Sequence, residues 1–111
     1  MDIVVTIPKS EEANIVIEDE FVAKLKGHAV QFWSVFKKPK DLTIGDRVYF
    51  VEHGHISCYH EFIGFIYDPV CEVTGRVWHG LNLLLNCPQV KLKNPVEHTG
   101  FQGFRYIERM E

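Results

Sequence analysis

The chain has 111 residues, of which 46% are hydrophobic and 24% are charged, and it carries a formal net charge of -3. A chain of this length folds as one domain around one core, so residues 1–111 are treated as a single domain. The composition excludes disorder, and the slightly acidic balance excludes a broadly basic surface that would bind nucleic-acid phosphates everywhere. A local basic patch is compatible with these numbers.

The three cysteines are odd in number and show no Cys-x-x-Cys spacing: Cys58, Cys71 and Cys87. We therefore expect buried thiols in a reducing compartment. The chain opens on a short apolar segment without a basic region, and its longest apolar run is far shorter than a membrane span. These features predict a cytoplasmic protein with no membrane partner.

The first predicted element is an apolar strand at residues 2–7, which Pro8 ends. Residues 10–26 predict a helix, because Ser10 is a suitable N-cap and apolar residues then recur at every fourth position. The β-branched run at 14–17 is also compatible with a short strand or an irregular turn. A second strand is expected at 28–36, followed by a charged loop at 37–41.

Residues 42–67 carry the most regular pattern, with an apolar alternation between a Gly45-Asp46 turn and a second turn at Gly54. This pattern predicts a hairpin with one buried face, in which Val48, Phe50 and Ile56 belong to the core. Beyond Asp68-Pro69, the chain predicts a short strand pair, or a strand plus turn, at 70–78. A strand at 81–85 follows, then a polar stretch interrupted by two prolines, and a last strand at 104–107.

Short strands at this spacing, with one early helix, predict an α+β fold. The expected architecture is a small mixed, mostly antiparallel β-barrel of about five to seven strands with the helix on one side.

A strand with Trp33-Ser34, a Lys/Pro loop and the run Leu42-Thr-Ile-Gly-Asp-Arg-Val-Tyr-Phe-Val51 together resemble the PUA-like superfamily, with the ASCH and EVE domains as nearest branches. The later Gly103-Phe-Arg-Tyr-Ile107 is similar to the closing segment of such barrels. The resemblance implies RNA binding, recognition of a modified base or, in some ASCH members, hydrolysis of an acylated nucleoside. The Gly-x-Lys-x-x-Glu-x-Arg element of the ASCH branch is absent after Gly27, which favours binding over catalysis.

Aromatic and basic residues adjoin at several points of the chain. An unpaired base needs a flat ring to stack on and polar groups to read its edge, and its phosphates need nearby cations. We therefore predict an RNA- or base-binding site without metal or cofactor. In it Trp33 and Trp78 stack on the base, Ser34 contacts its edge, and the cations hold phosphates: Lys37, Lys38, Arg76 and Arg105. Core packing of either tryptophan is the alternative.

Two other functions stay open. One is a nucleoside-directed amidohydrolase that uses Lys24 or Lys26 together with Glu61. The other is a non-catalytic interaction domain whose pocket has closed.

Four of the six histidines lie between residues 53 and 79: His53, His55, His60 and His79. A zinc site would need three or four ligands converging on one point. His55 and His60 are five residues apart and therefore face opposite sides of a regular strand. We expect surface or turn histidines and no metal.

Overall fold

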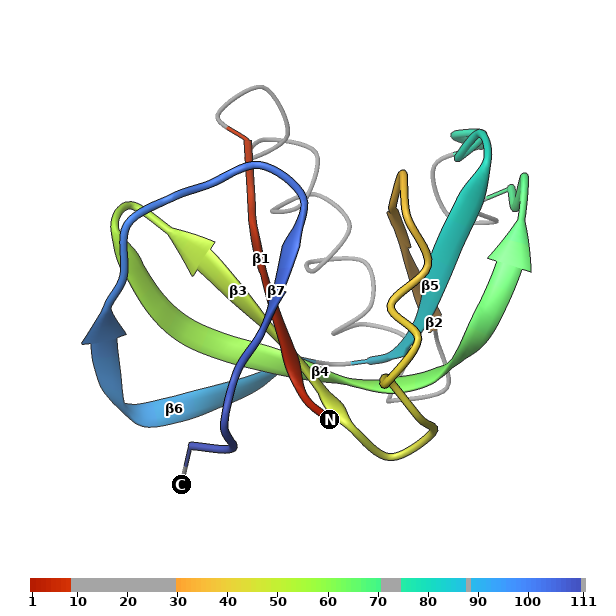
Figure 1. Cartoon of the computed structure of the whole chain (residues 1–111). Coiled ribbons are helices and arrows are strands. Elements are labelled where there is room, and N and C mark those ends of the chain that lie inside the picture. Colours follow the sequence, from red (N-terminus) through yellow and green to blue (C-terminus); the bar gives the residue numbers. More distant parts are fainter. Residues whose placement is uncertain (9–29, 71–74, 88, 111) are drawn as a thin grey trace.

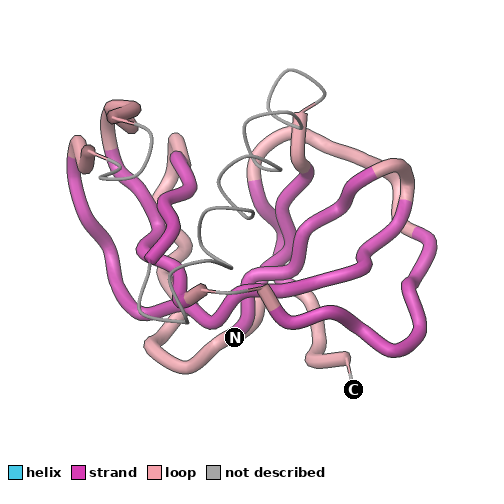
Figure 2. Tube along the Cα trace, turned by 180° about the vertical axis from the view of Figure 1, so that it is seen from behind, coloured by secondary structure: helices cyan, strands magenta, loops and turns pink. Residues whose placement is uncertain are grey.

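The computed structural model describes residues 1–8, 30–70, 75–87 and 89–110, and these residues form seven strands (Figure 1). The strands are β1 (Ile3–Thr6), β2 (Val30–Ser34), β3 (Arg47–Glu52), β4 (His55–Tyr67), β5 (Leu81–Asn86), β6 (Val90–Glu97) and β7 (Phe104–Tyr106). No helix occurs in this described part of the chain (Figure 2). The helix expected at 10–26 lies outside it.

The strands pair in the order β2-β5-β4-β3-β1-β7, and β6 pairs separately with β4. The β1–β3 pair is parallel and the other pairs are antiparallel. Strand β4 is 13 residues long, and it pairs with β3 and β6 through its first half and with β5 through its second half. It therefore joins two layers that diverge in Figure 1. The larger layer contains β7, β1, β3, β6 and the first half of β4, whereas the smaller layer contains the second half of β4, β5 and β2.

The predicted α+β barrel is wrong, because the described chain is all-β and its sheet is open. Strands β2 and β7 stand at the two ends of the pairing order and do not pair with each other. Strand β7 has only three residues, and all of them pair with β1. Apolar alternation indicates which face of a strand is buried, but it carries no information on whether two end strands meet.

The change of layer along β4 takes place at Gly64. The pairing register with β5 shifts between Phe62 and Gly64, and Gly64 has a φ of 153°. A backbone of this kind favours glycine, since L side chains rarely adopt it. The irregularity bends the strand, as β-bulges do, and lets one strand serve both layers.

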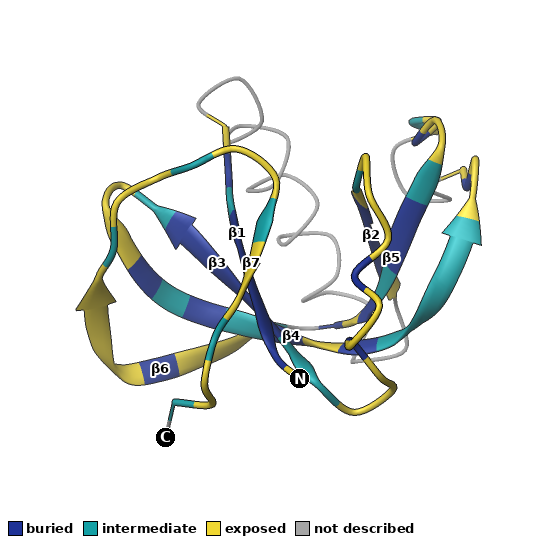
Figure 3. Cartoon of the chain, in the orientation of Figure 1, coloured by how far each residue is buried: buried dark blue, intermediate teal, exposed yellow. Residues whose placement is uncertain are grey.

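The core consists of two clusters on opposite faces of the larger layer. Ile3 and Val5 of β1 face the cluster that lies between the layers, whereas Val4 faces the second cluster. Strand β3 behaves in the same way, so its residues 48–51 are all buried (Figure 3). The second cluster is covered by β6 and the C-terminal segment, where Tyr49 Oη accepts a hydrogen bond of 2.9 Å from the N–H of Met110.

The hairpin predicted at Gly54 is confirmed. Glu52 pairs with His55, and the two residues between them, His53 and Gly54, have φ values of 52° and 75°. Positive φ at both central positions is typical of the type I′ turn, whose twist suits a two-residue hairpin. The predicted core residues of this hairpin are buried: Val48, Phe50 and Ile56.

Strand β6 falls in the polar stretch with two prolines, where no strand was expected. Leu92 is its one buried residue, and Pro95 lies within it. Proline is tolerated there because β6 is an edge strand whose outer side has no ladder partner among the described strands.

Two predictions for the cysteines and for residues 70–78 are answered in part. Cys58 and Cys87 are buried thiols as expected, and Cys71 lies outside the described residues. An isolated bridge joins Val70 to Val77, while residues 71–74 are not described.

Candidate functional site

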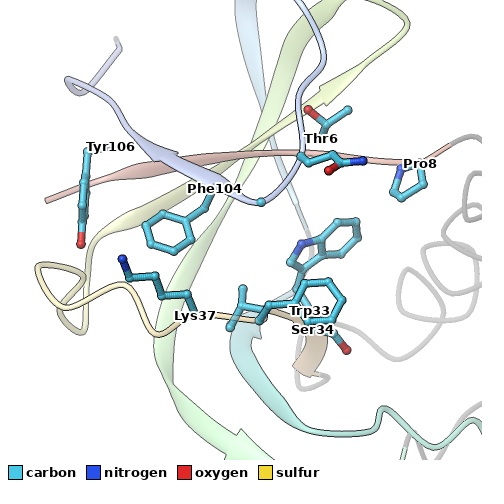
Figure 4. A pocket seen from close by; sticks show the side chains of 11 residues that line it. Thr6, Pro8, Trp33, Ser34, Lys37, Phe104 and Tyr106 are labelled. Carbon is cyan, nitrogen blue, oxygen red and sulfur yellow. The ribbon is translucent and has the colours of Figure 1, made fainter.

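A cleft with a volume of about 550 Å³ lies between the two end strands of the open sheet. One wall is formed by the end of β2 and the residues after it, 33–37, and the other by residues 102–104 and Tyr106 (Figure 4). Thr6 and Pro8, at the end of β1, complete the lining. The cleft therefore lies on the side where the sheet does not close.

Aromatic rings form much of the lining. Trp33 is the most buried of them, with 8% of its surface exposed, because it packs edge-on against Phe50 at a centroid distance of 5.0 Å. Phe104 and Tyr106 lie on the same face of β7 and make a T-shaped pair at 5.6 Å. Phe36 is fully exposed. Such a lining suits a flat, apolar ring.

One end of the cleft is polar. Figure 4 shows the amine of Lys37 reaching toward Tyr106, while Trp33 and Pro8 lie at the opposite end. Tyr106 Oη accepts a hydrogen bond of 3.1 Å from the N–H of Asp41, which ties β7 to the loop that follows β2. The arrangement combines an aromatic end with a cationic end.

Ser34 lines the cleft, but its hydroxyl serves the fold. It donates to Asn82 Oδ1 at 2.9 Å, and Asn82 Nδ2 donates in turn to the carbonyl oxygen of Trp78 at 2.9 Å. Asn82 is fully buried, so this short chain of hydrogen bonds satisfies a polar side chain that would otherwise destabilise the core.

The cleft contains Trp33, Ser34 and Lys37 from the predicted site, and the four other predicted residues lie elsewhere. Each of their cations covers an aromatic ring of the protein itself. Lys38 lies 4.7 Å from the centre of Phe65, and Arg105 lies 4.5 Å from that of Phe101. Arg76 lies 3.9 Å from the ring of Trp78, which is 5% exposed. The guanidinium of Arg76 therefore covers the ring of Trp78, which was expected to contact a ligand.

The sequence reasoning did not select the exposed Phe36 or the polar residues Thr6 and Gln102, which also line the cleft. The alternation that buries Trp33 indicates nothing about a residue two positions beyond the end of its strand. Phe104 and Tyr106 were expected in the last strand, but not in the binding site. Their pairing with β1 could not be inferred, because it joins opposite ends of the chain.

The residues of the amidohydrolase alternative do not meet in this cleft. Glu61 is exposed on β4, opposite Arg47 in the pairing register, and it does not line the cleft. Lys24 and Lys26 lie outside the described residues.

The histidines differ from the prediction at one position. His53, His55 and His79 are exposed, but His60 is 3% exposed and lies edge-on to Phe50 at 5.3 Å. Its Nδ1 lies 2.8 Å from the carbonyl oxygen of Asn86, which can only accept, so Nδ1 donates. Burial lowers the pKa of His60 below the ordinary 6.5, and this hydrogen bond opposes the shift in part. Within the described residues, no group of three His, Cys, Asp or Glu side chains is arranged to hold a metal ion.

Comparison with protein-family models, curated proteins and solved structures found no significant match. A helix long and apolar enough to cross a membrane is absent from the described residues.

Proposed function

We propose that the chain binds nucleic acid through one unpaired base, which enters the cleft between β2 and β7. The observation that carries this proposal is the fully exposed ring of Phe36 at a cleft that is also lined by Trp33, Phe104 and Tyr106. Water does not favour an exposed phenyl ring, whereas a base stacks on one with a gain of about 1–3 kcal/mol. Every base offers an aromatic face, so this mode fits a reader of single strands.

Trp33 has a different role from the one that the sequence suggested. Its ring is too buried for a base to stack on both of its faces. In this proposal the exposed part of the ring contacts the edge of the bound base. Phe36 supplies the exposed ring, and the half-buried Phe104 supplies a second ring at the cleft. The resemblance to PUA-like domains makes the proposal more specific: the nucleic acid would be RNA, and the base would be a modified one.

The test follows the two tryptophan indole N–H signals by ¹⁵N–¹H NMR, assigned with the Trp78→Phe variant. The ligands are the four ribonucleosides, their monophosphates and a single-stranded RNA of about ten nucleotides. We expect the Trp33 signal to shift while that of Trp78, which lies outside the cleft, stays in place. If neither signal nor any other cleft resonance responds at millimolar ligand, base binding is refuted.

Phe36→Ala is the decisive variant, because a fully exposed side chain can be removed without loss of core packing. Loss of one stacking ring is expected to weaken binding about 5- to 150-fold, as the stacking energy implies. Ile44→Ala is the matched control, since Ile44 is 74% exposed and does not line the cleft. Equal affinity of the two variants would rule out Phe36 as the stacking ring.

A further inference from the structure

The charges around the cleft restrict what it can hold. Among the described residues that line it, Lys37 is the one charged residue, and none of them is Asp or Glu. The other basic residues expected to hold phosphates lie over Phe65, Trp78 and Phe101 instead. The described cleft therefore offers a single positive charge, which matches one anionic group and not a row of them.

The position of that charge adds a direction. Lys37 and Tyr106 lie at the same end, and Trp33 lies at the other (Figure 4). An ammonium group only donates hydrogen bonds. Tyr106 Oη already accepts the N–H of Asp41, so its own hydrogen is left to donate. Two donors at one end and apolar rings at the other suit a molecule with an oxyanion at one end and a flat ring at the other.

The size of the cleft agrees with a small ligand. Its volume of about 550 Å³ lies within the range of about 300–1,000 Å³ that is usual for small-molecule sites. The interior of a single-stranded nucleic acid, in contrast, is bound along an extended basic groove that contacts several successive phosphates.

We propose that the cleft takes one nucleoside monophosphate unit, with its base among Phe36, Phe104 and Trp33 and its phosphate on Lys37 and the Tyr106 hydroxyl. This inference rests on the proposed function and narrows it. The unit is a free mononucleotide or the phosphorylated end of a nucleic-acid strand. These two fit better than the interior of a strand, because the described residues of the cleft lining include one cation, Lys37.

The experiment measures dissociation constants for a nucleoside, its monophosphate and two oligomers of about ten nucleotides, one with a 5′-phosphate and one without. The proteins are wild type, Lys37→Gln and, as matched control, Lys40→Gln, an exposed lysine of the same loop that does not line the cleft. We expect the monophosphate to bind about tenfold more tightly than the nucleoside in wild type and Lys40→Gln, because a charge-assisted contact contributes on this scale. Lys37→Gln should remove this difference and leave nucleoside binding unchanged.

Salt dependence and the choice of oligomer distinguish a free mononucleotide from a strand end. They also distinguish failure of the single-nucleotide inference from failure of the base-binding proposal. For the oligomers, one phosphate contact predicts a slope of log affinity against log salt near -0.7, and preference for the 5′-phosphorylated oligomer identifies a strand end. A slope of about -2 or steeper, or equal binding of nucleoside and monophosphate, would overturn the single-nucleotide inference while base binding stands. Absence of binding by all four ligands would overturn both proposals.

Discussion

For single residues, Arg76 and Trp78 show what residue spacing in the sequence can predict and what it cannot. Their spacing of two predicts that both side chains lie on one face of a strand. In the structure neither residue belongs to a strand, and the guanidinium lies 3.9 Å from the centre of the indole ring. The same contact occupies the ring, and the tryptophan is buried. Sequence spacing therefore indicated that the two side chains are neighbours, but it could not distinguish a stack that binds a ligand from one that covers the protein's own surface. Trp33 is buried through a contact that also lies outside its own strand, namely its edge-on packing against Phe50.

His60 makes the stability of the protein depend on pH. Its pKa in the folded state is lowered by burial, below the value of 6.5 expected in the unfolded chain. The contribution of His60 to the free energy of unfolding is therefore fully present above pH 6.5. As the pH falls below that value, the unfolded chain binds a proton that the folded protein does not, and the free energy of unfolding decreases until the lowered pKa is reached.

His60→Asn tests this dependence. The asparagine amide can donate from nearly the same position as Nδ1, but it does not titrate. Urea denaturation between pH 7.5 and pH 5 should show a smaller loss of stability in this variant than in wild type, beneath a general decrease at pH 7.5 caused by the lost ring packing. His55→Asn removes an exposed histidine of the same strand and should keep the wild-type slope. Parallel curves for His60→Asn and wild type would contradict the assignment.

At the level of elements, the positions of most strands follow from apolar runs and turn residues. The strands expected near residues 2–7, 28–36, 42–67, 81–85 and 104–107 all have counterparts in the structure. The missed strand β6 is polar because it pairs on one side with β4 and is otherwise exposed, so it lacks the pattern that marks a buried strand. Closure of the sheet could not be predicted either, since it depends on the meeting of distant end strands.

Gly64 provides a test of the bend in β4. A Cβ added there meets no atom within 4 Å, so the cost of Gly64→Ala comes from its φ of 153° alone. We expect this substitution to reduce the free energy of unfolding by about 1–3 kcal/mol, measured by urea denaturation. Ser57→Ala, on the same strand, should change it far less, because Ser57 does not have a positive φ. An unaltered stability of Gly64→Ala would show that the bend does not depend on this residue.

For the whole molecule, β4 is the strand that belongs to both layers, and the cluster between them contains residues of each. The layers therefore share one strand and one core, which predicts a single cooperative unfolding transition. Far-ultraviolet circular dichroism, which reports the sheet, and tryptophan fluorescence, which reports the smaller layer through Trp33 and the segment at Trp78, should give the same midpoint in urea. Two separate midpoints would mean that the layers unfold independently.

The open side of the sheet has a mechanical consequence. Strands β2 and β7 bound the cleft from different layers, and these layers are covalently continuous through the bend at Gly64. A molecule bound in the cleft would contact both end strands of the sheet at once. It would thereby connect β2 and β7 reversibly, although these strands do not pair with each other. A ligand that binds only the folded state raises its stability, so one that contacts both margins would oppose the separation of β7 from β1.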